Sequence, residues 1–401
     1  MKWHRLLHNA WKHFYKKKKN TDGETMPSLS SFVKTYKTRL AVIERHLKRR
    51  DYNFGKWKAT LIPKKDGGNR PLIIPKSIND KLVLKAMSDY LADSFSPIFN
   101  SVSHVSYAYQ KGKSTRDALI QLKRMHNHEN ILLKIDIRHF FDEIDKIILI
   151  QLLNLYPIDD YVKNLINKCI NPIIDYSSLK ESDIGNFSQG GIPQGNPISA
   201  VLSNLYLYEL DRLAISKGWK MVRYADDMVF SVSNIKEAQR ILSQVEKYLL
   251  DNRNLTIHPL KKSSDAKTAI FLNPKNDNMV YLGVIFDGQN LFPTKECYDH
   301  LIRRIKTILK CTSPFEEKEK DIKKAIAQWC GYYAFTDIPN SKIRWMNNAI
   351  NYQMNKYKLN IPKVNVADII MKTRKRQNSR MTKLFYPIKF GDEYEWLSIY
   401  D

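Results

Sequence analysis

Short apolar runs separated by turn residues predict a mixed α/β core. From Trp57 to about Pro75 such runs alternate with turns, and a helical pattern then continues through Asp93. This order predicts two strands followed by a helix. Mixed helix and strand patterns continue to about Asn290, and Lys-rich helical patterns occupy residues 298–357. The chain is therefore predicted to be an α+β protein whose mixed part precedes a helical part.

The N-terminal segment is basic and rich in aromatic residues. Residues 1–20 hold seven Lys or Arg and no acid, with Trp, Phe and Tyr interleaved. Such a segment either stacks on single-stranded nucleic acid or forms an ordinary amphipathic helix at a basic terminus. Residues 20–24 are predicted to be a linker, and residues 30–50 a basic helix.

The charge of the whole chain indicates a polyanionic partner. Its formal net charge is +25, from 66 Lys and Arg against 41 Asp and Glu. Nucleic acid fits better than a membrane, because no apolar run approaches the roughly 18–20 residues of a spanning helix. The first residues lack the apolar core of a signal peptide. The 4 cysteines form no Cys-x-x-Cys pair, which argues against a zinc site and favours a reduced, cytoplasmic setting.

Three acidic residues fall at the ends of predicted strands. Asp226 and Asp227 lie between two short apolar runs, which predicts a hairpin with adjacent carboxylates at its turn, and Asp136 ends a run that begins at Ile131. Three carboxylates so placed can hold two divalent cations about 3.5–4 Å apart, which clamp the attacking and leaving oxygens of a phosphoryl transfer. Mg²⁺ suits such a site because it takes few carboxylates and adds substrate phosphates.

Four further blocks accompany the acidic turn in a fixed order. They are residues 60–72 (TLIPKKDGGNRPL), 106–114 (SYAYQKGKS), 135–144 (IDIRHFFDEI) and 189–199 (QGGIPQGNPIS). Together with Tyr-Ala-Asp-Asp they resemble the palm of a reverse transcriptase over residues 58–335. The best match is to the bacterial group II intron and retron-like enzymes. The resemblance implies a right-hand polymerase fold with fingers, an antiparallel palm sheet and a helical thumb.

The resemblance also implies roles for individual residues. Asp136 and Asp226 would bind both metal ions, and Asp227 would support the site and the primer end. Phe141 would exclude a 2′-hydroxyl from the nucleotide site and so favour dNTP over rNTP. Asp142, Glu143 and Asp145 are interpreted as surface or capping acids, and Phe140 as a core residue. Contacts to the nucleotide are implied for Lys64, Arg70, Phe141, Gln194 and Lys261, and contacts to primer or template for Tyr224, Gly283, Arg303 and Arg304.

Four segments follow from this interpretation. Residues 1–50 would be a basic N-terminal extension, 51–290 the fingers and palm, 291–360 the helical thumb and 361–401 a basic C-terminal tail. The block at 106–114 would position template or primer, although Gln110 stands where relatives usually have Arg.

The expected activity is RNA-directed DNA polymerisation with dNTPs, two Mg²⁺ ions (Mn²⁺ as a substitute), an RNA template and a DNA product. The palm alone would suit an RNA-templated RNA polymerase equally well, and Phe141 favours DNA. No endonuclease module is expected after the thumb, and no Val-Thr-Gly signature of retron enzymes is found. These features favour a defence-type enzyme that works with a dedicated noncoding RNA. The alternatives are an intron-type or retron enzyme, a polymerase primed from its own Tyr or Ser hydroxyl, and a noncatalytic RNA-binding scaffold.

Overall fold

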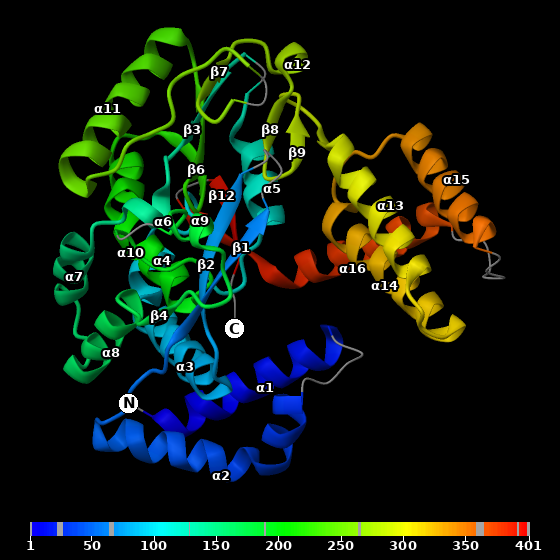
Figure 1. Ribbon diagram of the computed structural model, residues 1–401. Coiled ribbons are helices and arrows are strands. Elements are labelled where there is room, and N and C mark those ends of the chain that lie inside the picture. Colours follow the sequence, from blue (N-terminus) through cyan, green and yellow to red (C-terminus); the bar gives the residue numbers. More distant parts are fainter. Residues whose placement is uncertain are drawn as a thin grey trace. The chain divides into compact units, whose positions relative to one another are not determined.

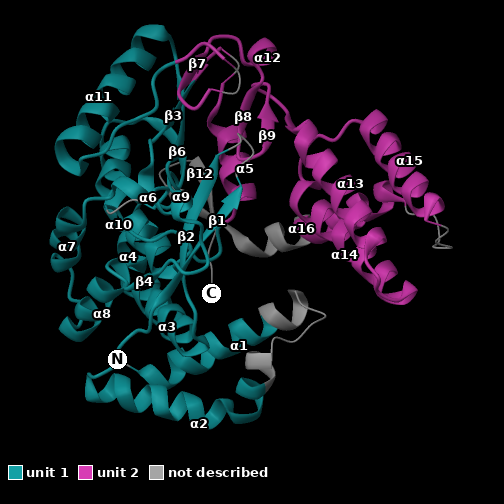
Figure 2. Cartoon of the chain, in the orientation of Figure 1, with its two compact units in different colours: residues 1–113, 133–260 teal, residues 114–132, 261–401 magenta. Residues whose placement is uncertain are grey.

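The structure of the chain is a computed structural model that divides into two compact units (Figure 2). Unit 1 contains residues 1–113 and 133–260, and unit 2 contains residues 114–132 and 261–401. The structure describes residues 2–21, 27–63, 68–127, 129–187, 190–263, 266–357, 365–390 and 393–398. The division into functional segments at residues 50, 290 and 360 stays a prediction.

Unit 1 begins with two long helices, α1 (Trp3–Thr21) and α2 (Pro27–Arg49), which pack on each other and on α3 (Ile78–Ser94) (Figure 1). Trp3 and Trp11 are buried. The Trp11 ring lies 5.0 Å from the ring of Phe32 and 5.3 Å from the ring of Tyr36. These two tryptophans therefore pack the helical core, so the structure favours the amphipathic-helix interpretation of the N-terminal segment over stacking on nucleic acid.

The strands β1 (Trp57–Pro63) and β2 (Asn69–Pro75) form the antiparallel hairpin that the sequence predicts. Their register runs from Trp57 opposite Pro75 to Pro63 opposite Asn69. The short strand β4 (Ile174–Asp175) pairs in parallel with β1 on its other side. The tip of the hairpin, residues 64–67, lies outside the described residues, and so does the predicted nucleotide contact Lys64.

A second sheet in unit 1 carries the predicted acidic residues. Within the unit the strands β5 (Lys220–Tyr224), β6 (Asp227–Val232) and β3 (Ile131–Asp136) lie side by side in that order. The helix α11 (Ile235–Arg253) packs on β6, and α10 (Pro197–Ser216) packs on α3 and α11. Of the 20 residues of α10, 13 are buried, which makes it the central helix of the unit.

The other helices of unit 1 are short. They are α4 (Ser96–Ser101), α6 (Phe140–Glu143), α7 (Lys146–Asn154), α8 (Asp160–Ile170) and α9 (Glu181–Ile184). Asp145 caps α7, because its carboxylate accepts the backbone N–H groups of Ile147 and Ile148. This agrees with its interpretation as a capping acid, and Phe140 is 3% exposed, as expected for a core residue.

Unit 2 begins with α5 (Thr115–Met125) and continues with short strands and a helical part. The antiparallel strands β8 (Met279–Tyr281), β9 (Val284–Phe286) and β10 (Leu291–Pro293) have the order β10-β9-β8. The remaining small elements are β7 (Ala269–Phe271), α12 (Pro274–Asp277), β11 (Phe385–Phe390) and β12 (Glu393–Ser398), of which the last two form an antiparallel pair.

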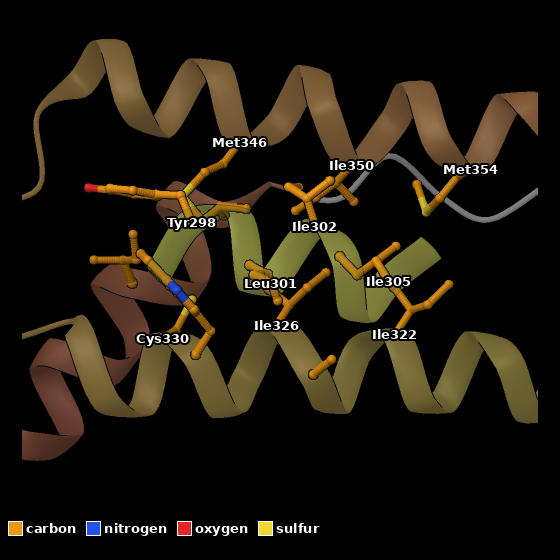
Figure 3. Close-up of a cluster of buried hydrophobic side chains, with 14 of the residues drawn as sticks. Tyr298, Leu301, Ile302, Ile305, Ile322, Ile326, Cys330, Met346, Ile350 and Met354 are labelled. Carbon is orange, nitrogen blue, oxygen red and sulfur yellow. The ribbon is translucent and has the colours of Figure 1, made fainter. Parts of the chain in front are cut away.

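Four helices of unit 2 share one hydrophobic core: α13 (Lys295–Lys310), α14 (Phe315–Tyr333), α15 (Asn340–Lys356) and α16 (Val366–Leu384). Figure 3 shows Tyr298, Ile302 and Ile326 facing Met346 and Ile350 across this core. The helices α13 and α15 are amphipathic, so their charged residues stay on the outside while their apolar stripes are buried. No helix among the described residues is long and apolar enough to cross a membrane.

Candidate active site

The backbone on both sides of Asp136 is fixed by hydrogen bonds to two different segments of unit 1. The Ile137 N–H donates to the Asp226 carbonyl oxygen at 3.4 Å, which places the end of β3 beside the turn between β5 and β6. On the other side, the His258 N–H donates to the Asp136 carbonyl oxygen at 2.9 Å. Asp136 itself is 5% exposed. The order of the strands therefore brings the backbone of Asp136 beside the turn that carries the other two predicted acids.

The turn that carries Asp226 and Asp227 is a tight β-hairpin. Tyr224 pairs with Asp227, which leaves only Ala225 and Asp226 between the strands. Ala225 adopts a φ of 59°, a left-handed conformation that costs free energy for a residue with a Cβ atom. Another group in the structure must therefore stabilise this turn.

Arg223 is the side chain that holds the turn. One of its terminal nitrogens (Nη1) donates to the Ala225 carbonyl oxygen at 2.8 Å. The guanidinium also forms a two-point contact with the Asp211 carboxylate on α10, including an Nε–Oδ1 distance of 2.7 Å. Both side chains are 1% exposed. Burial raises the pKa of Asp211, and the Arg223 charge opposes that shift.

The same guanidinium connects the turn to the segment at 106–114. Arg223 Nη2 donates to Ser106 Oγ at 2.8 Å, and the Tyr107 N–H donates to the Arg223 carbonyl oxygen at 3.0 Å. From α10, the Asn204 amide donates to the Ala108 carbonyl oxygen at 2.7 Å. We call Arg223, Asp211, Asn204 and Ser106 the buried brace. It ties a strand, a helix and a loop together beneath the acidic turn.

Tyr109 belongs to the same loop and follows Ala108. Its φ is 57°, and its side chain is 44% exposed. Burial of part of the ring raises the pKa of its hydroxyl, and the charge of Asp226 raises that pKa further. Tyr224 acts in the same direction, whereas Arg70 opposes the shift. The hydroxyl therefore lies in the electrostatic field of both the acidic turn and a predicted phosphate contact.

Phe141 and Gln194 are brought together at the start of α6. The Ile192 N–H donates to the Phe141 carbonyl oxygen at 2.8 Å, and the Gln194 amide donates to Asp142 Oδ1 at 3.2 Å. The approach is close enough that a Cβ atom on Gly191 would lie 2.2 Å from the Phe141 carbonyl oxygen. Only glycine allows this contact, so it explains one glycine of the block at 189–199.

The strand β2 is attached to the same block. The Ile73 N–H donates to the Gln194 carbonyl oxygen at 3.0 Å. Arg70 is exposed and lies opposite Ile62 in the β1–β2 register, close to the hairpin tip. The structure thus places Arg70, Phe141, Gln194, Tyr224 and the three acids within unit 1, with backbone contacts that connect their segments.

A cavity of about 220 Å³ lies beside Gln194. Its lining includes Ile73, Asp142, Lys146 and Gly191. Burial lowers the pKa of Lys146, whose ammonium donates to Asn171 Oδ1 at 3.0 Å. The volume of the cavity is below the roughly 300–1,000 Å³ of typical ligand sites.

The other predicted contacts belong to unit 2 and are described within it. Lys261 is exposed, as are Arg303 and Arg304 on the outer face of α13, where Arg304 donates to Gln328 Oε1 at 2.8 Å. Gly283 has a φ of 76° and Leu282 a φ of 50°, so the β8–β9 turn requires a residue that tolerates a left-handed backbone. A Cβ atom on Gly283 would meet no atom closer than 3.8 Å, so the turn conformation, and not close approach, explains this glycine.

The donor atoms of the three acids fit a hard divalent cation. Carboxylate oxygens without His or Cys suit Mg²⁺ or Mn²⁺ better than softer metals. Two adjacent aspartates and a buried third also concentrate negative charge that bound cations would compensate. In the described part of the chain, no three His, Cys, Asp or Glu side chains have already converged into a metal-binding group. Metal binding by Asp136, Asp226 and Asp227 therefore stays a prediction that rests on the type and placement of these donors.

Sequence reasoning missed Arg223, Asp211 and Tyr109. A signal for the first two was present, because an Arg interrupts the apolar run of β5 and an Asp stands in the apolar helix α10. Charged residues in elements that are otherwise buried require a partner. The pairing itself could not be read from the sequence, because it depends on how strand and helix pack.

Comparison with known proteins identifies the family. Residues 62–286, more than half of the chain, match the model of the family described as reverse transcriptase (RNA-dependent DNA polymerase). The chain belongs to this family. Its α+β architecture with antiparallel sheets is the right-hand polymerase fold that the sequence predicts.

Curated relatives agree with this assignment. The chain is 32% identical to the group II intron-encoded protein LtrA of Lactococcus lactis over 164 residues, which are 40% of this chain and 25% of that protein. It is 33% identical to an uncharacterized 91 kDa protein in the cob intron of Schizosaccharomyces pombe over 165 residues, 41% of this chain and 19% of that protein. Protein YkfC of Escherichia coli is 25% identical over 268 residues, 56% of this chain and 65% of that protein. The chain thus spans a quarter or less of the first two proteins.

Among solved structures, the telomerase of Candida albicans in complex with a fragment of telomeric RNA matches with a TM-score of 0.48 and 11% identity. That match covers 88% of this chain and 67% of the telomerase chain. Apo telomerase of Candida tropicalis matches with a TM-score of 0.47 and 12% identity, over 82% and 63% of the two chains.

Proposed function

We propose that the chain is an RNA-directed DNA polymerase that extends a primer 3′-hydroxyl with dNTPs. The observation that supports this most directly is the backbone contact between Ile137 and Asp226, which sets Asp136 beside the acidic turn. Membership of the reverse transcriptase family supplies the RNA template and the DNA product.

In this proposal Asp136, Asp226 and Asp227 hold two Mg²⁺ ions. Bound there, the ions would activate the primer hydroxyl and neutralise charge on the leaving pyrophosphate. Tyr224 and Gly283 would orient the primer end, and Arg303 and Arg304 would follow the duplex by contacts to phosphates.

The nucleotide is held by a second group of residues. Lys64 and Arg70 would contact the triphosphate, where the Arg fork offers two parallel hydrogen bonds. Gln194 would contact the sugar from its position beside Asp142, and Lys261 would deliver a proton to the departing pyrophosphate. These roles place charged donors where negative charge develops, which is the largest contribution that a protein makes to such a reaction.

The test is primer extension by the purified chain on a defined RNA template with a DNA primer, dNTPs and Mg²⁺. DNA that copies the template, and that disappears when EDTA removes the metal, supports the proposal. If RNA binds but no product forms with Mg²⁺ or Mn²⁺, the chain is a noncatalytic RNA-binding scaffold.

Replacing Phe141 with Val is expected to let the enzyme accept ribonucleotides. The Ile192 N–H fixes the Phe141 backbone and thereby the point from which the ring would meet the nucleotide sugar. Incorporation of rNTP relative to dNTP should rise about 10- to 100-fold, in the range that pocket size alone can supply.

Phe141→Tyr is the matched control, because it keeps the ring and should keep the discrimination against rNTP. Single-nucleotide incorporation with each nucleotide type measures both variants. Unchanged discrimination in Phe141→Val would show that another residue selects the sugar.

The biological role that we propose is antiviral defence together with a dedicated noncoding RNA, in the cytoplasm. Sequencing the RNA that co-purifies with the chain tests the RNA partner: one defined species supports it, and a random mixture contradicts it. A product that stays attached to protein after denaturation, and is released by protease, would instead indicate priming from a Tyr or Ser hydroxyl. An intron or retron RNA among the bound species would favour those classes of enzyme.

A further inference from the structure

The outer face of α15 carries two large aromatic side chains that are exposed. The inner face of this helix buries Met346, Ile350 and Met354 in the core of unit 2 (Figure 3). On the outside, Trp345 is 44% exposed and Tyr352 is 63% exposed. Single exposed apolar residues are common in proteins, so their number alone means little. Their arrangement is more informative.

Trp345 and Tyr352 lie on one line along the helix. Seven residues are nearly two turns, so the two rings share a face and are about 10 Å apart along the axis. The exposed Asn348 lies between them, three residues after the first and four before the second. The Trp345 ring makes an edge contact with Tyr298, at 6.4 Å between ring centroids, which fixes its orientation while much of its surface stays open.

The charged side chains that α15 itself carries are all positive. The sequence of α15 contains Lys342, Arg344 and Lys356 and no Asp or Glu. All three cations are exposed, and none forms an ion pair with a carboxylate in the described part of the chain. An anionic partner would therefore meet cations that need not first leave another ion pair.

We infer that this face of α15 binds a single-stranded segment of RNA whose unpaired bases stack on Trp345 and Tyr352. Aromatic rings beside cations are the combination that binds single strands, since rings stack on bases while cations neutralise phosphates. The Asn348 amide between the rings can bond to a base edge or to a 2′-hydroxyl, which favours RNA over DNA.

Two other partners fit the face less well. A protein partner would require a contiguous apolar patch, but the polar amide of Asn348 separates the two rings. A membrane surface would require a continuous apolar stripe, and the stripe of α15 is already buried in the core. This inference concerns binding outside the proposed polymerase site, and it does not depend on that activity.

The test is the affinity of the full chain for a fluorescein-labelled, unstructured RNA of about 20 nucleotides, long enough to span both rings. Fluorescence anisotropy without dNTPs or divalent metal reports binding even if the protein has no polymerase activity. Trp345→Ala and Tyr352→Ala should each weaken binding about 10-fold, as expected for the loss of one stacked base. The same substitutions should weaken the binding of single-stranded DNA of the same sequence by a smaller factor.

Matched variants separate stacking from general effects. Trp345→Phe and Tyr352→Phe should bind as the wild type does, whereas the Leu variants should behave like the Ala variants. Phe315→Ala is the control, because Phe315 is also exposed, at 43%, but is followed by Glu316 and Glu317. It should leave RNA affinity unchanged.

A local readout completes the test. RNA that contains 4-thiouridine should crosslink to residues 340–356 of the wild type, and mass spectrometry would locate the site. The inference is overturned if these residues are not crosslinked, if Leu binds as well as Trp or Tyr, or if only DNA binding falls. Should Trp345→Ala fail to fold, as a melting curve would reveal, the more exposed Tyr352 still decides the question.

Discussion

Asp226→Asn is expected to reduce primer extension by at least about 10³-fold, since one charged metal ligand is worth several kcal/mol of transition-state stabilisation. The substitution keeps the size and shape of the side chain, and Asp226 is only partly buried, so the fold should survive. Asp136→Asn should have the same effect, because both residues are assigned to both metals. Single-turnover extension on an RNA template, with a melting curve for each variant, measures the change.

Glu143→Gln is the control for this prediction. Glu143 is an acid close in sequence to Asp136, but it is assigned no metal contact, so its loss should change the rate little. RNA affinity of the Asp226→Asn variant should equal that of the wild type, because the acid acts on the chemistry. Full activity with Asn at position 226 would remove the basis of the proposed mechanism.

The sequence predicted the local parts of this site well. The β1–β2 hairpin, the strand that ends at Asp136 and the tight turn that carries Asp226 each depend on patterns within about ten residues. The helix α10 begins inside the block at 189–199, at Pro197, and ends at Ser216. Asn196 caps it and Pro197 occupies its first turn, two start signals that the apolar spacing alone did not include.

Parts of the site that depend on distant contacts were not predicted. The Phe141 carbonyl oxygen lies so close to Gly191 that residue 191 must lack a Cβ atom. The positions of these two residues in the sequence do not indicate this contact. The burial of Trp3 and Trp11 likewise depends on the packing of α1 against α2 and α3, and a list of aromatic and basic residues does not contain that information. The composition of a segment indicates which partners it could bind. Packing determines which of its side chains remain exposed and available for binding.

Disruption of the buried brace is expected to lower both the stability and the activity of the protein. Arg223→Met is expected to destabilise the fold by about 3–5 kcal/mol, because it leaves the Asp211 charge buried without its partner. Such a loss of stability alone would indicate only that Arg223 has a structural role. The double variant Arg223→Met, Asp211→Leu removes both charges, and replacing a buried ion pair with apolar residues of similar volume is often neutral. Its melting temperature should return toward that of the wild type.

Activity should not return with stability in this double variant. It still lacks the hydrogen bonds to the Ala225 carbonyl oxygen and to Ser106 Oγ, which hold the left-handed turn and the loop beside it. A displacement of about 1 Å at a reacting group can lower the rate about 10²-fold, so we expect a loss of that order in kcat with little change in the KM for dNTP.

Two further variants identify the brace as a positioning device. Arg223→Lys keeps the charge but cannot contact Asp211, Ala225 and Ser106 together, so it should recover stability better than activity. Arg212→Met alters an exposed Arg on the same helix as Asp211 and should leave both quantities near their wild-type values. If the stable double variant extends primers as fast as the wild type, then the strain at Ala225 is held by the strands alone, and Arg223 contributes only to folding.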